Sequence, residues 1–243
     1  MLKEAIEKIT ELAGAKFHEA DGHIYTDGTI TEVRPELDLI RTLSLTSLDA
    51  LIQFIKKEAV HITEKFEPLF ITVSSHKDVF CYTAIEPENR NQRTLLYHVT
   101  ATDVPGWESE TKLPFEQASI ALQTRFQETD DRNYTLRILS QITSGGKVTY
   151  NDNGIATSVI TQKGIALQGS EVIRPLVKLR PYRTFQEVMQ PEGMFLIRVD
   201  ERGISFIEAD GGMWKLSARQ IVKEYLEKEL EELIKAEKVN VAL

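Results

Sequence analysis

Residues 180–216 read RPYRTFQEVMQPEGMFLIRVDERGISFIEADGGMWKL, and residues 217–238 continue SARQIVKEYLEKELEELIKAEK. Two apolar runs in this stretch, residues 194–199 and 204–207, flank the charged turn 200–203, which ends in a glycine. Apolar runs joined by a short polar turn with glycine are typical of two antiparallel strands. We therefore predict that this strand pair, with the segment after it, closes the core of the fold.

The segment after the strand pair predicts one long amphipathic helix near the C-terminus. Ser217 followed by Gln220 has the spacing of a capping box, and the helix is expected over residues 218–238. One side of this helix is a continuous apolar stripe and the other is charged. Such a helix packs either within its own chain alone or also on a second subunit. We predict a homo-oligomer interface, and its expected residues are Tyr225, Leu226, Leu230 and Leu233.

The first half of the chain alternates amphipathic segments with β-rich runs. Residues 69–75, 79–86 and 93–101 are β-rich and joined by short polar turns, which indicates an antiparallel meander. Apolar residues at helical spacing predict helices over residues 2–13 and from a cap at Thr46 to about residue 59. We therefore predict an α+β fold: a mainly antiparallel sheet with three to five packing helices and the long C-terminal amphipathic helix.

The middle of the chain predicts two further helices and a hairpin. One helix is expected after Pro114 and the next from a cap at Asp130 or Asp131. The dipeptide Asn153-Gly154 between two β-rich runs is typical of a tight hairpin turn. No shift of composition marks a firm boundary. We therefore predict a single α+β domain over residues 1–243, with a possible sub-division near residues 103–114.

Composition and charge limit the classes of function. Apolar residues make up 42% and charged residues 27% of the 243 residues, as in ordinary soluble globular proteins. The formal net charge of −8 disfavours duplex nucleic acid as the main ligand, because proteins that grip phosphate backbones are usually basic. The first residues lack the apolar core of a signal peptide, no run is long enough to cross a bilayer, and Cys81 is the single cysteine. We expect a cytoplasmic protein with no membrane partner.

Two polar clusters are candidate sites, although no stretch carries a specific catalytic, metal-binding or cofactor-binding motif. Glu208 and Asp210 stand beside two glycines at a strand end, where they could act as acid and base or bind a cation. Asp-Gly-Gly is also what a strand-to-helix turn requires. The second cluster could stack on bases, bind a phosphate, or pair with neighbouring carboxylates. Its members are Arg180, Arg183, Arg198 and Trp214. We predict no catalytic residue, no metal and no cofactor.

Several segments resemble the YfdQ-like family of phage and prophage proteins. They are SLTSLDALIQFIKK (44–57), FITVSSHKDVFCYTAIEPENRN (70–91), RPYRTFQEVMQPEGMFLIRV (180–199) and FIEADGGMWKL (206–216), together with Val104-Pro-Gly-Trp107. The family is found in the early or recombination-associated regions of temperate phages, so the resemblance implies a phage or prophage origin. It implies no activity and no residue role, because the family has no established catalytic residues.

The patterns leave three hypotheses for function. The leading one is a non-enzymatic phage or prophage protein in the cytoplasm of the host bacterium, which self-assembles into a homo-oligomer and acts by binding. The second is a single-stranded nucleic-acid accessory protein in phage recombination, which the arginine and aromatic cluster favours and the acidic charge opposes. The third is a metal-dependent hydrolase or nuclease that uses Glu208 and Asp210.

Overall fold

The computed structural model of the chain divides into two compact units, residues 1–40 and 41–243. It describes residues 3–4, 6, 8, 17–20, 23–26, 41–66, 68–86, 91–107, 109, 111–144, 147–152, 157–163 and 166–243. In the first unit, β1 (Phe17–Ala20) and β2 (His23–Thr26) pair antiparallel. Of the helix predicted over residues 2–13, the four described residues are helical and the others lie outside the described part. The division into these two units falls after residue 40.

The second unit is an α+β structure, as predicted, and its first core is built on a five-stranded sheet of order β14-β4-β5-β6-β3. Strands β4 (Leu69–Val73), β5 (Asp78–Tyr82) and β6 (Leu95–Thr100) form the antiparallel meander that the sequence predicts. The short strands β3 (Leu43–Leu45) and β14 (Val239–Ala242) join the two edges in parallel, so this sheet is mixed.

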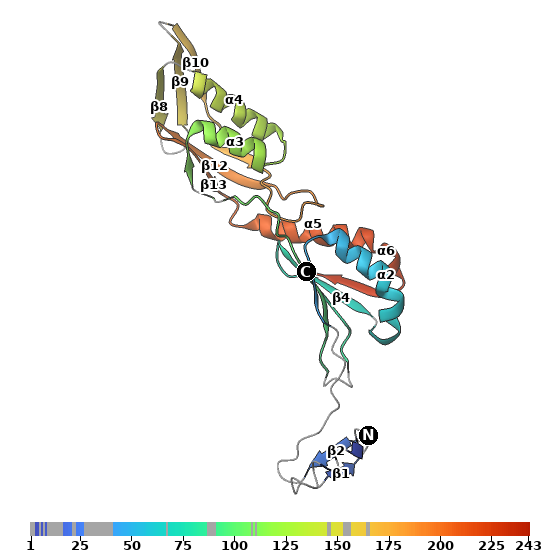
Figure 1. Ribbon diagram of the computed structural model, residues 1–243. Coiled ribbons are helices and arrows are strands. Elements are labelled where there is room, and N and C mark those ends of the chain that lie inside the picture. The colour runs from blue at the N-terminus through green and yellow to red at the C-terminus, as the bar shows by residue number, and fades with distance from the viewer. Residues whose placement is uncertain are drawn as a thin grey trace. The chain divides into compact units, whose positions relative to one another are not determined.

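Three helices cover one face of this sheet: α2 (Leu48–Phe66), α5 (Met213–Glu229) and α6 (Glu231–Lys235) (Figure 1). The cap of α2 is Ser47, whose Oγ accepts a hydrogen bond from the Ala50 amide at 3.1 Å, and not the predicted Thr46. The Leu48 amide donates to Glu187 Oε1 at 2.7 Å, so a distant segment also satisfies this helix end.

The predicted C-terminal helix begins earlier than expected and is interrupted. Gly211 and Gly212 have φ of 62° and 81°, and α5 begins directly after them because glycine tolerates this left-handed conformation. Ser217 is therefore inside the helix, where its Oγ donates to the Met213 carbonyl at 3.3 Å, and its prediction as a cap is wrong. The helix ends before Leu230, and α6 follows as a separate short helix.

Two residues of the predicted oligomer interface lie in the core of the chain itself. Leu226 is 0% and Leu230 is 1% exposed, and both belong to the apolar cluster between the helices and the sheet. Their prediction as interface residues is wrong, since a side chain already removed from water gains nothing by contact with a partner. Tyr225 and Leu233 are half-buried and pack against the same cluster. The Tyr225 hydroxyl donates to Asp49 within the chain.

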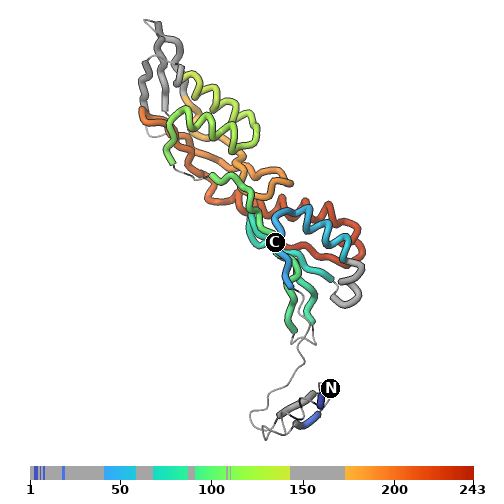
Figure 2. The backbone as a smooth tube through the Cα atoms, in the orientation of Figure 1, coloured from blue at the N-terminus to red at the C-terminus, as the bar shows by residue number. Residues whose placement is uncertain are grey.

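The second core lies against an antiparallel sheet of order β11-β12-β13-β7. The predicted strand pair is β12 (Gly193–Asp200) with β13 (Gly203–Glu208), and the short strands β11 (Leu176–Leu179) and β7 (Lys112–Leu113) flank it. The backbone crosses from the first core to this one after β6 and returns along α5 (Figure 2).

Two predicted helices, α3 (Phe115–Arg125) and α4 (Asp130–Ser144), pack on this second sheet. The cap of α4 is Thr129, whose Oγ1 accepts from the Arg132 amide at 3.1 Å, so the predicted caps Asp130 and Asp131 are wrong. The Asp131 carboxylate instead accepts from the Lys178 amide at 2.7 Å and thereby ties α4 to β11.

A separate antiparallel sheet contains the predicted hairpin. Strands β8 (Lys147–Asp152) and β9 (Thr157–Lys163) pair with each other, and β10 (Ala166–Val172) pairs with β9. The predicted turn at Asn153-Gly154 lies outside the described residues. Across the part of the chain that is described, no helix combines the length and apolar character needed to cross a membrane.

Candidate functional site

A pocket of about 520 Å³ lies where elements of the two cores meet. The turn between β4 and β5, the loop before β7, the end of α3 and the start of α5 all contribute to its wall. The lining residues with polar or aromatic groups are His76, Lys77, Trp107, Thr111, Arg125, Arg183, Glu208, Trp214 and Lys215. We call this site the cationic pocket.

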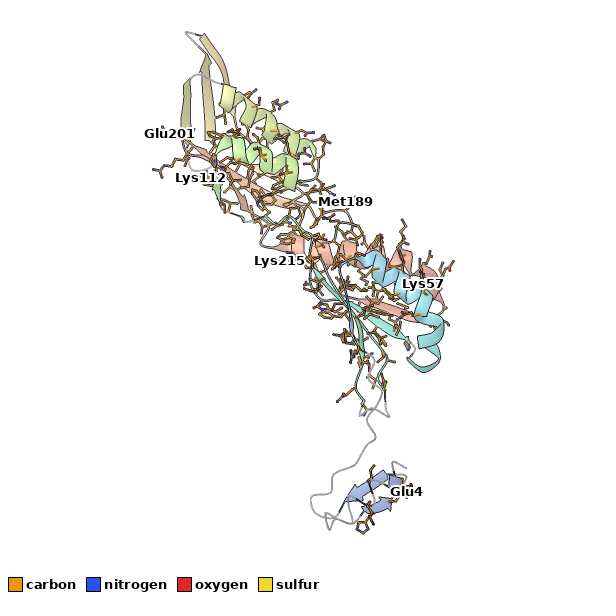
Figure 3. The ribbon with its side chains drawn as sticks, viewed as in Figure 1. Glu4, Lys57, Lys112, Met189, Glu201 and Lys215 are labelled. Carbon is orange, nitrogen blue, oxygen red and sulfur yellow. The ribbon has the colours of Figure 1, made fainter. Side chains whose placement is uncertain are left out.

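The charge of the cationic pocket is opposite to that of the whole chain. Among its described lining residues, one is acidic, Glu208, and four are basic: Lys77, Arg125, Arg183 and Lys215. The chain as a whole has a formal charge of −8. Lys215, which Figure 3 labels, lies in the first turn of α5, where the amide ends of the helix add further positive potential. The pocket therefore has the electrostatics of an anion-binding site.

Arg183 is the most enclosed of these cations, because its side chain is 6% exposed. Its Nη1 donates to Glu208 Oε1 at 2.7 Å, and its Cζ lies 3.7 Å from the ring centroid of Trp214. Trp214 Nε1 donates to the other oxygen of Glu208 at 3.2 Å. One carboxylate thus orients both the guanidinium and the indole. A β-carbon at Gly193 would lie 2.4 Å from Arg183 Nη2, so glycine leaves the space that the guanidinium occupies.

Arg183 keeps donors that its neighbours do not satisfy. Within the described residues, its Nε and Nη2 are buried and have no hydrogen-bond partner, and the same holds for Trp107 Nε1. A buried donor without a partner carries a free-energy penalty, and an acceptor that reached it would remove that penalty. Burial lowers the pKa of Arg183 to about 10, against the opposing effect of Glu208 and Asp210. The guanidinium therefore remains charged at neutral pH.

His76 lines the pocket beside its cations. Its ring packs edge-on against Trp214, with 4.8 Å between the ring centroids. Burial lowers the pKa of His76, and the charges of Lys77, Lys215 and Arg183 lower it further, while Asp78 raises it. The turn that carries His76 is held in place because Thr184 Oγ1 donates to the His76 carbonyl at 2.5 Å. An anion in the pocket would offset the part of this lowering of the His76 pKa that comes from the nearby cations.

The structure brings together two of the four predicted binding residues, Arg183 and Trp214. Trp214 is only 7% exposed and its ring is covered by Arg183, so its prediction as a platform for a base is wrong. Arg180 forms a separate ion pair with Glu192 at 3.4 Å, and Arg198 lies on β12, in register with Ser205. The other cations of the pocket come from segments far apart in the sequence, where no spacing signal connects them.

The two candidate acidic residues have structural partners. Glu208 is held by Arg183 and Trp214, as described above, and Asp210 Oδ1 accepts from the Gly212 amide at 3.0 Å in the turn before α5. Across the described residues, no group of three or more His, Cys, Asp or Glu side chains is arranged to hold a metal ion. These contacts favour the turn interpretation that the sequence left open.

Comparison of the chain with protein-family models, curated proteins and solved structures finds no match. The ligand of the cationic pocket is therefore inferred from the chemistry of its own residues.

Proposed function

We propose that the chain is a non-enzymatic protein of phage or prophage origin that acts in the bacterial cytoplasm by binding an anionic ligand in the cationic pocket. The observation that carries the proposal is a pocket whose described lining includes four basic side chains and one carboxylate, in a chain with a formal charge of −8. Glu208 in this proposal orients Arg183 and performs no acid or base step. The resemblance to the YfdQ-like family supports the origin.

Preorganisation favours binding at this site. Arg183 is already fixed between Glu208 and Trp214, so its guanidinium loses little conformational entropy when an anion arrives. The two lysines, Lys77 and Lys215, are more exposed and add positive charge within the pocket. A ligand with several anionic oxygens, such as one carrying phosphate, matches this arrangement of a fixed planar donor and mobile point charges.

Sulfate titration tests the proposal, because a ligand that binds only the folded state raises the unfolding temperature. Sulfate also stabilises proteins by general exclusion from their surfaces, so matched variants decide the outcome. Lys215→Gln and Lys77→Gln should reduce the sulfate response, relative to potassium chloride at equal ionic strength. Lys57→Gln, on α2 and outside the pocket lining, should keep the response of the unmodified chain (Figure 3). Identical responses in all three variants would contradict the proposal.

Self-assembly into a homo-oligomer is a second part of the proposal. The surface proposed for it is the start of α5, in place of the interface residues predicted from the sequence. Met213 and Leu216 are 61% and 49% exposed at the start of α5, where apolar side chains of this size gain by burial. Multi-angle light scattering measures the mass directly. We expect a mass above that of one chain at micromolar concentration, reduced in a Met213→Gln, Leu216→Gln double variant. A monomer under these conditions would exclude self-assembly.

A further inference from the structure

The five-stranded sheet has a second face, opposite the one that α2, α5 and α6 cover. Side chains alternate along β4 and β5, so that Ile71 and Cys81 are fully buried while their neighbours are partly exposed. The register places Phe70 opposite Tyr82, and Phe80 opposite His98, on this second face. We call the surface formed by Phe70, Phe80, Tyr82 and His98 the aromatic face.

Three rings of the aromatic face, those of Phe80, Tyr82 and His98, lie in contact with one another through Phe80. Phe80 and His98 stack with 4.4 Å between their centroids and 10° between their planes. Phe80 and Tyr82 are 6.2 Å apart, with planes inclined by 31°. Cross-strand ring pairs also stabilise a sheet, but these rings lie outside the core and remain partly exposed. A set of partly exposed aromatic rings is a surface on which unpaired bases can stack, because every base has a π-face.

One cation covers a ring of the aromatic face, and another directly precedes β5 in the sequence. Arg93 Cζ lies 4.3 Å from the ring centroid of Phe70, and its Nη1 donates to the Thr83 carbonyl at 2.9 Å. Strand β5 starts directly after Lys77, which lines the cationic pocket. The chain advances roughly 17 Å from Lys77 to Tyr82, at ~3.3 Å per residue. This length corresponds to a few nucleotides, which is close to the smallest single-strand binding sites, of roughly 4 nucleotides.

One carboxylate, Asp78, lies on the same surface. Its Oδ2 accepts from Ser75 Oγ at 2.8 Å, and its Oδ1 accepts from Thr100 Oγ1 at 3.1 Å. Oδ1 is also 3.3 Å from Nε2 of His98, the ring that stacks on Phe80. Asp78 thus fixes His98 within the set of rings, and its charge is partly compensated by these donors.

We infer that the aromatic face and the cationic pocket form one binding track for single-stranded nucleic acid. Bases stack on the rings of the aromatic face, and phosphates contact Arg93 and Lys77. The inference rests on the proposed function in one respect, namely that the pocket receives an anionic group. A single strand is the occupant because stacking on protein rings requires unpaired bases, and the net charge of −8 disfavours a duplex as the main ligand.

Fluorescence anisotropy with labelled oligo(dT) and oligo(rU) of roughly 20 nucleotides at low salt tests the track. Phe80→Leu and Tyr82→Leu keep apolar volume but remove the ring, and each should weaken binding by roughly tenfold. Arg93→Gln should reduce the slope of log affinity against log salt by about 0.7, the value for one phosphate of a single strand. The matched controls are Tyr134→Leu and Arg174→Gln, because Arg174 Cζ lies 3.9 Å from the ring of Tyr134 on α4, away from the track. Neither control should change affinity.

The outcomes separate this inference from the proposed function. If Lys215→Gln weakens oligonucleotide binding but Tyr82→Leu behaves like Tyr134→Leu, the pocket stands and the aromatic face is wrong. If no oligonucleotide binds at low salt but sulfate still stabilises the protein, the binding track is wrong and the proposed anion pocket stands. If Tyr82→Leu changes the mass by light scattering and leaves DNA affinity unchanged, the face is an interface between copies instead. Unfolding temperatures verify folding, and Tyr82→Leu decides alone if Phe80→Leu is unfolded.

Discussion

Arg183 and Glu208 should have unequal costs of removal, because one partner is far more enclosed than the other. Their side chains are 6% and 28% exposed. Glu208→Ala removes the carboxylate that is hydrogen-bonded to the buried guanidinium and leaves Asp210 as the remaining nearby acidic charge. This costs about 3 kcal/mol, at the lower end of the range for a broken buried pair, since water reaches the vacated space. The substitution also removes the acceptor of Trp214 Nε1, for about 1 kcal/mol more. We therefore expect a loss of about 4 kcal/mol.

Arg183→Met should cost only about 1 to 2 kcal/mol, the value of its contact with the Trp214 ring. This variant leaves a carboxylate that water can reach, and it removes the buried donors Nε and Nη2 that have no partner. The free energy of unfolding is measured in urea by tryptophan fluorescence. The chain has two tryptophans, Trp107 and Trp214, and both lie in the unit of residues 41–243. A loss with Arg183→Met as large as with Glu208→Ala would refute the reasoning.

Three further predictions use the same unfolding assay or a simple chemical probe. Gly203→Ala should lower the free energy of unfolding by about 3 kcal/mol or more, because φ is 140° and a β-carbon would lie 2.1 Å from the Leu113 carbonyl oxygen. Gly211→Ala should lower it by about 1 kcal/mol, because φ is 62° but the space around the residue is open. Because folding lowers the pKa of His76 from its usual 6.5, the unfolded chain takes up a proton at this residue more readily than the folded chain. The unfolding temperature should therefore fall as the pH drops through that value. His76→Gln should make this fall smaller. Burial raises the pKa of the Cys81 thiol to about 12, so iodoacetamide should label the native protein far more slowly than the urea-unfolded protein, and equal rates would contradict the buried position.

The strands that the sequence predicts are those whose own residues alternate. In β4 and β5, buried and partly exposed side chains follow one another along the strand, and the short turn after Ser74 forces the two strands to pair. The edge strands β3 and β14 have three and four residues, too few for a period to be visible. The conformation of β3 and β14 depends on pairing with strands distant in the sequence, so no local pattern predicts them.

Helix ends were harder to predict than helices, because the residues that satisfy them need not be local. Ser217 has the right neighbour for a capping box, but the two glycines before Met213 start the helix earlier. At the start of α2, the Leu48 amide finds its acceptor in Glu187, 139 residues away. A capping pattern in the sequence therefore predicts that a helix is nearby more reliably than it predicts where the helix begins.

The cationic pocket could not be predicted from charge, because net charge is a sum over the whole chain and binding is local. Exposed charges separated by more than about 10 Å are largely screened at moderate salt, so carboxylates farther than that from the pocket oppose its cations only weakly. A formal charge of −8 therefore argues against long-range attraction of a polyanion, and not against a site of four cations. If the track binds single-stranded nucleic acid through Arg93 and Lys77, its affinity should depend on salt with a slope of about −0.7 per neutralised phosphate. A much steeper dependence would require cations beyond the pocket and the aromatic face.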